Sequence, residues 1–201
     1  MIPKVIHKIW ISENPTPEKF KKYTDTWNLS DCDVWEWGYP GGEVNLFKNS
    51  KCVKWCIKNK NNVVLNHYYR YYKLHYFGGI YLDLDIEVVK PFDDLLNNKF
   101  VIGYESDTWI NNAVMMGEAG SKFMKDCLDC MDNMDLTIPE VELETGPRLV
   151  TKLIKENQYD DVTVLPERYF SPHRWYQKYD PKEITPDTYC VHHFEHSWKK
   201  D

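Results

Sequence analysis

The 201-residue sequence lacks an excess of basic residues, a long apolar run and any internal repeat. Its 25 Lys and Arg residues are outnumbered by 31 Asp and Glu residues, which argues against a nucleic-acid-binding protein, because such proteins carry a basic patch. Because no stretch of about 18 apolar residues occurs, we expect no transmembrane helix. The first residues also lack the apolar core of a signal peptide, so we expect a cytoplasmic or otherwise soluble protein.

No linker or low-complexity segment divides the chain, and its length suits one domain, so we predict a single domain over residues 1–201. Strand-like segments, such as 4–11 and 100–104, alternate with helix-like segments, such as 50–59 and 66–77. This order predicts an α/β fold with helices on both faces of a mostly parallel sheet. Ligands of such sheets bind beyond the carboxyl ends of the strands.

The six cysteines include two pairs at helical spacing, Cys52 with Cys56 and Cys127 with Cys130. A Cys-x-x-Cys pair can bind zinc or act in redox chemistry. Both pairs, however, fall within apolar stripes of predicted helices, and a free cysteine behaves as a small hydrophobic residue. We therefore predict buried, reduced thiols, which fits a reducing compartment.

Three carboxylates, Asp83, Asp85 and Glu87, alternate with apolar residues in segment 80–88. In an extended chain the carboxylates would share one face, where they would repel one another. Strands are also poor in Asp, so folding alone does not explain this arrangement. A bound divalent cation would explain it, because hard cations take oxygen ligands. The alternative is a solvated strand edge followed by a turn.

Two further residues are candidates for ligand contact. Trp10 ends the first predicted strand, where it either stacks on a planar ligand or belongs to the core. Arg70 lies in the predicted helix 66–77 and shares a face with His67. Its side chain points either toward the carboxylates or a ligand, or toward solvent. The pair Gly78-Gly79 predicts the end of this helix.

Taken together, these segments resemble the glycosyltransferases whose sugar-binding region contains a DXD motif. The family includes the initiating α-mannosyltransferase of fungal outer chains, capsular-polysaccharide transferases and, more distantly, the large glucosylating bacterial toxins. The resemblance runs nearly from end to end and rests on the opening residues 2–10, on Tyr68-Tyr69-Arg70, on Gly78-Gly79-Ile80-Tyr81-Leu82-Asp83-Leu84-Asp85, on Lys90-Pro91, on Thr145-Gly146-Pro147 and on residues 192–198.

The resemblance implies a GT-A fold with a Rossmann-like nucleotide-binding sheet in a single catalytic domain. It also implies a metal-dependent retaining glycosyltransferase of polysaccharide biosynthesis. Such an enzyme moves a hexose or N-acetylhexosamine from a nucleotide sugar to a glycan hydroxyl. A UDP-sugar is the favoured donor and GDP-mannose the second candidate, and the expected metal is Mn²⁺ or Mg²⁺.

The resemblance also implies roles for individual residues. Asp85 would bind the metal directly, while Asp83 would contact the donor sugar or ribose and the metal shell. Arg70 would contact the donor sugar or phosphate, and together with Asp83 and Asp85 it forms the predicted catalytic set. Trp10, with Ile9 beside it, would stack on the nucleotide base.

The C-terminal segment would complete the donor site. Either His192 or His193 would supply a contact to the metal or the diphosphate, and in an extended chain these two side chains face opposite ways. Ser197 and Trp198 would close over the diphosphate. Asn112 is a further predicted donor-binding residue.

One position departs from the family pattern. The family usually has Ala-Ser-Asp before the arginine, whereas this chain has Leu65-Asn66-His67. His67 can donate or accept a hydrogen bond but cannot make the charged contact of the usual Asp. A second hypothesis is therefore a catalytically impaired module that binds a sugar or nucleotide, and a third is a metal-dependent phosphohydrolase.

Overall fold

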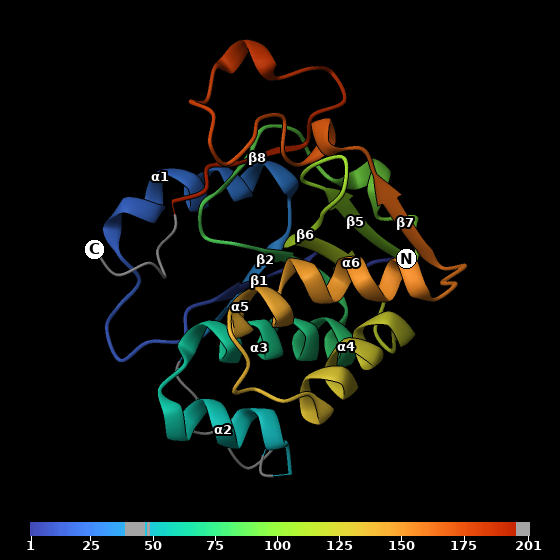
Figure 1. Ribbon diagram of the computed structural model, residues 1–201. Coiled ribbons are helices and arrows are strands. Elements are labelled where there is room, and N and C mark those ends of the chain that lie inside the picture. Colours follow the sequence, from blue (N-terminus) through green and yellow to red (C-terminus); the bar gives the residue numbers. More distant parts are fainter. Residues whose placement is uncertain (39–46, 48, 196–201) are drawn as a thin grey trace.

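A computed structural model describes residues 1–38, 47 and 49–195. Its centre is a six-stranded sheet with the strand order β2-β1-β3-β6-β5-β7 (Figure 1). A small second sheet pairs β4 with β8. The strands are β1 Val5–Ile9, β2 Asp33–Trp37, β3 Gly79–Leu82, β4 Ile86–Val88, β5 Phe100–Tyr104, β6 Ile110–Gly117, β7 Val162–Leu165 and β8 Cys190–His192.

The predicted α/β fold is confirmed, and the large sheet is mostly parallel, as predicted, with β6 running opposite to its other five strands. β1 runs parallel to β2 and β3, and β5 runs parallel to β7. β6 is antiparallel to both of its neighbours, β3 and β5. The short connection between β5 and β6 requires this direction, because parallel neighbours need a long crossover.

Helices cover both faces of the large sheet, as predicted, but the two faces are covered unequally. One face carries the longer helices (Figure 1). Their apolar side chains pack with Tyr81, Ile102 and Met115 of the sheet. The other face carries a short helix, 3-10 turns and the small sheet. The helices are α1 Lys21–Thr24, α2 Lys51–Asn59, α3 Asn62–Phe77, α4 Lys122–Asn133, α5 Val141–Thr145 and α6 Pro147–Glu156. The 3-10 turns are Glu18–Phe20, Asp25–Ser30, Asp93–Leu95, Glu167–Tyr169 and Pro181–Glu183.

Local sequence signals set the ends of α3, the longest helix among the described residues. The side chain of Asn61 caps its first turn by accepting a hydrogen bond from the Val64 N–H. The helix therefore begins four residues earlier than the predicted residue 66. It ends before Gly78, whose φ of +63° and whose close approach to the Ala119 backbone leave no room for a Cβ.

The predicted strand 80–88 is two strands with a turn between them. β3 ends at Leu82, and β4 begins at Ile86 and belongs to the small sheet. Ile80, Leu82 and Ile86 nevertheless pack in one core, as the alternation predicted. Asp83 and Asp85 consequently lie in a turn at the carboxyl end of β3, rather than along one face of a strand.

All six cysteines are free thiols. Cys52, Cys56 and Cys127 are buried as predicted, whereas Cys130 is half-buried at the edge of the core. Within residues 1–38, 47 and 49–195, no helix has the length and apolar character needed to span a membrane.

Candidate active site

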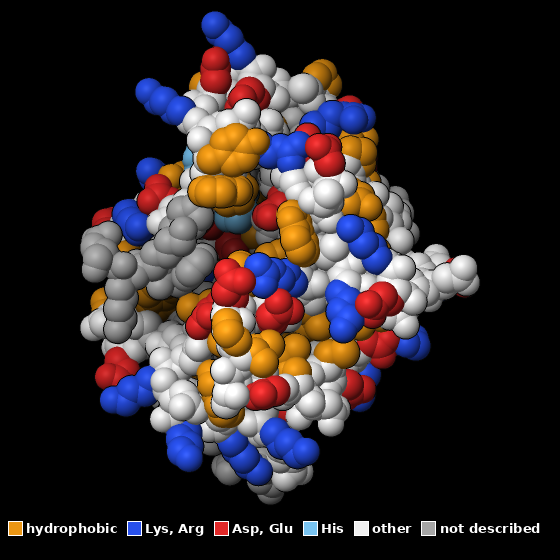
Figure 2. All heavy atoms as spheres, in the orientation of Figure 1, with side chains coloured by type: hydrophobic (Ala, Val, Ile, Leu, Met, Phe, Trp, Pro, Cys, Tyr) orange, Lys and Arg blue, Asp and Glu red, His pale blue; other side chains and the backbone are white. Residues whose placement is uncertain are grey.

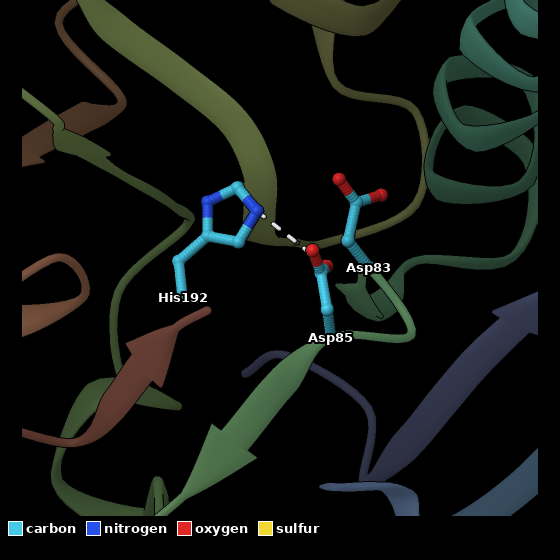
Figure 3. Close-up of side chains that lie close together, drawn as sticks. All are labelled: Asp83, Asp85 and His192. Carbon is cyan, nitrogen blue, oxygen red and sulfur yellow. Dashed lines mark ion pairs between the residues drawn. The ribbon is translucent and has the colours of Figure 1, made fainter. Parts of the chain in front are cut away.

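Asp83, Asp85 and His192 form a cluster at the carboxyl end of β3 (Figure 3). One ligand atom from each residue lies within 4.8 Å of the others, and His192 Nε2 is 3.5 Å from Asp85 Oδ1. Two carboxylate oxygens and one imidazole nitrogen suit a hard or borderline divalent cation such as Mg²⁺ or Mn²⁺. The donor set thus fits the metal that the DXD motif implies.

Backbone pairing brings these distant residues together. Asp83 is held at the sheet edge because its N–H donates to Ala113 O of β6 (2.9 Å). β8 pairs antiparallel with β4, which places His192 opposite Ile86, the residue after Asp85. The Glu195 N–H also donates to Asp85 Oδ2 (2.8 Å). The turn and the C-terminal segment therefore fix one another.

The charges of the cluster depend on one another. Burial would raise the pKa of Asp85, but His192 and the Glu195 N–H lower it to about 2. Burial would lower the pKa of His192, yet the neighbouring Asp85 raises it above its ordinary value. For Asp83 burial dominates and raises the pKa, although Arg70 opposes this effect. Asp85 is therefore the carboxylate most strongly held in its charged form.

Arg70 faces the cluster and not solvent. Its side chain is buried in α3, and Nη2 lies 3.0 Å from Asp83 Oδ1. Nη1 donates to Asn112 O at 2.9 Å, and the guanidinium lies over the Tyr81 ring at 4.3 Å. The Tyr81 hydroxyl donates to the same Asp83 oxygen. Arg70 thus holds the Asp83 carboxylate in its orientation.

The cluster lies in a large cleft of about 1200 Å³, whose opening is visible as a hollow in Figure 2. Ile9 and Trp10 line it at the exit of β1, and His67 and Asn112 line it near Arg70. Trp10 is half-buried, and its Nε1 donates to Asn14 O (2.9 Å), so one part of its ring packs while another faces the cleft.

His67 is buried and neutral. Burial lowers its pKa well below the ordinary value, and the charge of Arg70 lowers it further. Its Nδ1 is 3.0 Å from Thr145 Oγ1. Gly146 is needed beside it, because a Cβ there would lie 2.8 Å from His67 Cε1. Thr145-Gly146 therefore forms a support for the histidine that replaces the usual Asp.

Some predicted site residues are not brought to the cluster. His193 points away, and its Nε2 is 2.8 Å from Glu87 Oε2 while its ring stacks on Tyr23. The side chain of Asn112 donates to Tyr71 Oη, so only its backbone carbonyl contacts Arg70. Ser197 and Trp198 lie outside the described residues.

Two residues absent from the predicted site support His192. Asn111 Nδ2 donates to Glu105 Oε2 (2.6 Å) and lies 3.2 Å from His192 Nδ1. Its Oδ1 accepts from the Ala113 N–H (2.7 Å), which fixes the orientation of the amide. The pair Asn111-Asn112 marks the start of a strand in the sequence, but only the strand pairing reveals which of the two faces the cluster.

Comparison with known proteins agrees with this geometry. Residues 8–101 match the family described as glycosyltransferase sugar-binding region containing DXD motif.

The chain is 29% identical over 124 residues to inositol phosphoceramide mannosyltransferase 1 of Schizosaccharomyces pombe (53% of this chain, 37% of that protein). It is 25% identical to the uncharacterized glycosyltransferase L373 of Acanthamoeba polyphaga mimivirus (98% and 84%). It is 31% identical to lactosylceramide 4-alpha-galactosyltransferase of Gorilla gorilla gorilla (62% and 41%). The chain thus spans about two fifths of the first and third of these relatives.

Two solved structures share the fold. The PaToxG glycosyltransferase superposes with a TM-score of 0.58 at 20% identity, covering 77% of this chain and 69% of that one. A glycosyltransferase involved in glycosylation of the major capsid of PBCV-1 superposes with a TM-score of 0.52 at 13% identity (94% and 93%). At these identities the likeness establishes the fold alone.

The predicted resemblance to this family is therefore confirmed. The DXD segment, the fold and the named relatives all agree with the resemblance found in the sequence. Residues 8–101 of this chain are thus similar to the glycosyltransferases whose sugar-binding region contains the DXD motif.

Proposed function

We propose that this protein is a metal-dependent retaining glycosyltransferase. It would move a hexose or N-acetylhexosamine from a nucleotide sugar, with a UDP-sugar favoured and GDP-mannose second, to a hydroxyl of a glycan acceptor. The observation that carries this proposal is the cluster of Asp83, Asp85 and His192 inside the same cleft as Trp10. A metal site and an aromatic wall in one cleft suit a nucleoside diphosphate.

Asp83, Asp85 and His192 would hold the divalent cation. When bound, the cation neutralises the negative charge that develops on the diphosphate leaving group. Arg70 keeps Asp83 in place through its 3.0 Å contact. This pre-set arrangement matters because a site that must reorganise during the reaction loses much of its electrostatic advantage.

The remaining cleft residues would position the donor. Trp10 would stack on the base, with Ile9 beside it at the end of β1. His67 uses Nδ1 for Thr145, so its Nε2 remains for a hydroxyl of the donor sugar. Correct placement of both reactants supplies much of the rate enhancement in such a two-substrate reaction.

The proposal is tested with a panel of nucleotide sugars and Mn²⁺, measuring the release of free nucleoside diphosphate. We expect release from one donor, dependent on Mn²⁺ and stimulated by a glycan acceptor. His67, which stands where the family usually has Asp, favours one other candidate. This is a binding module, which would bind the nucleotide but release no diphosphate. Cleavage of a simple phosphate ester without a nucleoside would instead identify a phosphohydrolase.

A further inference from the structure

The sheet topology orders the groups along the cleft. β1 and β3 are parallel, so Trp10 and Asp83 leave the sheet at the same edge. β6 is antiparallel to β3 and begins at this edge with Ile110, followed by Asn111. β5 reaches the same edge with Tyr104, which precedes Glu105. Trp10 and the turn after β5 therefore lie on opposite sides of the metal cluster.

The cleft is larger than one small ligand requires. Its volume of about 1200 Å³ exceeds the roughly 300–1,000 Å³ typical of pockets for a single small molecule. If the nucleotide lies on the Trp10 side of the cluster, the part of the cleft beside β5 and β6 remains for a second ligand. Two tryptophans, Trp109 and Trp175, line this second part of the cleft.

Both tryptophans are exposed. Trp109 is 41% exposed and Trp175 is 60% exposed, and Tyr176, in edge-to-face contact with Trp175, is 69% exposed. Figure 2 shows hydrophobic side chains gathered along one rim of the hollow. Exposed aromatic clusters beside a cleft are characteristic of binding surfaces.

Hydrogen bonds and ion pairs hold the backbone around Trp109 and Trp175, the aromatic rim of the cleft, in place before any ligand binds. Trp109 closes a turn in which its carbonyl accepts from the Glu105 N–H (2.9 Å) and its N–H donates to Ser106 Oγ (3.0 Å). Arg174, directly before Trp175, links the two turns, because its guanidinium contacts Glu105 O (3.3 Å), Asp107 (3.7 Å) and Glu167 (2.9 Å). A preorganised surface loses less entropy when it binds.

The charges near the rim favour a neutral polar ligand over a lipid surface. Arg174 and Arg148 both have carboxylate partners, Arg148 with Glu140 and Glu144. Asp107 at 91% and Glu140 at 60% side-chain exposure leave negative charge facing solvent. Anionic membranes attract basic clusters and would be repelled here. A sugar ring, in contrast, offers a C–H face to an aromatic ring and hydroxyls to the surrounding polar groups.

From this arrangement we infer that Trp109 and Trp175 form the acceptor subsite and bind a saccharide ring of the acceptor by stacking. This inference rests on the proposed function and adds the side of the cleft, the residues and the chemical class of the acceptor group. Tyr176 supports Trp175 from outside the cleft. Donor and acceptor would then meet at the cluster between the two aromatic walls.

The test compares Trp109→Ala and Trp175→Ala with Trp35→Ala, a control on β2 that is 40% exposed and does not line the cleft. Binding is measured on an array of immobilised neutral glycans and on phosphatidylcholine–phosphatidylserine vesicles, and UDP affinity is measured with Mn²⁺. We expect each cleft variant to lose at least about tenfold in glycan affinity, as for a central aromatic anchor. UDP affinity and the control should change by less than about twofold, which is the scatter expected of a surface substitution.

Several results would overturn the inference. The first is that the wild-type protein binds no glycan, and the second is that glycan affinity survives both substitutions. The third is that the same variants lose UDP affinity, and the fourth is that vesicle binding depends on the two tryptophans. Thermal unfolding of each variant separates loss of fold from loss of contact. Failure of the proposed function would look different, because the wild-type protein would then release no diphosphate while the glycan measurement would still give an answer.

Discussion

Two carboxylate–imidazole pairs lie close together in this protein but have different surroundings. Asp85 and His192 lie in the cleft, with Asp83 and Asn111 beside them. Glu87 and His193 form a 2.8 Å contact outside it, where the imidazole stacks on Tyr23. In the sequence the two pairs are nearly equivalent. The comparison shows that acids and histidines close together in the chain can either converge in a cleft or form a separate pair outside it.

The largest expected difference between the pairs concerns activity. Asp85→Ala should lower metal-dependent diphosphate release at least about 1000-fold, because a metal contributes several kcal/mol of charge stabilisation. Glu87→Gln, which changes the matching acid, should retain activity within about twofold. Steady-state rates at saturating Mn²⁺ provide the measurement. Equal losses of activity in both variants would contradict the different roles given to Asp85 and Glu87.

The two histidines provide the second comparison. His192→Ala should raise the Mn²⁺ concentration needed for half-maximal donor hydrolysis by at least about 100-fold, the upper end of the effects seen for groups that merely support a ligand. His193→Ala should leave this concentration nearly unchanged, because its contacts are to Glu87 and Tyr23. The reverse result would assign the metal contact to His193.

The pH dependence of stability should also separate the pairs. The pKa of Asp85 is lowered to about 2, so its carboxylate stabilises the fold above its ordinary pKa near 4 and loses this effect as the pH falls through about 2. The contribution is roughly 2 kcal/mol at neutral pH. Denaturant unfolding of metal-free wild-type protein and Asp85→Asn between about pH 5 and pH 2 tests this, with Glu87→Gln as control. A constant difference between wild type and Asp85→Asn across that range would contradict it.

The smallest expected effect concerns Asn111, which touches only the cleft pair. Asn111→Ala removes the amide beside His192 Nδ1 and should weaken Mn²⁺ activation about tenfold, at the low end for residues that orient a metal ligand. Lys122→Ala, an exposed residue of α4, serves as the control. If Asn111→Ala leaves Mn²⁺ activation unaltered, His192 is positioned by β8 alone.

Much of the fold follows from local signals in the sequence. The stop at Gly78, the alternation in β3 and the apolar stripes around Cys52 and Cys127 all predicted their elements correctly. The mostly parallel sheet was predicted too, but the reversed direction of β6 was not, because its place beside β3 depends on contacts between distant segments. For the same reason, segment 80–88 was predicted as one strand although β4 leaves the large sheet to pair with β8.

The site shows the same division. Asp83, Asp85 and Arg70 could be named from one short stretch and one helix, since they follow one another closely in the chain. Glu105 and Asn111 could not, because Asn111 matters through its contact with His192, which is far away in sequence, and Glu105 through its contact with Asn111. Choosing His192 over His193 likewise required the register between β4 and β8.

The most direct test of the proposed metal site is a calorimetric titration of the protein with Mn²⁺ in the presence of UDP. We expect the wild-type protein and Glu87→Gln to bind one Mn²⁺ per chain with similar affinity, and Asp85→Ala to show no saturable binding. Undiminished Mn²⁺ binding by Asp85→Ala, or no Mn²⁺ binding by the wild-type protein, would contradict a metal site at Asp83, Asp85 and His192.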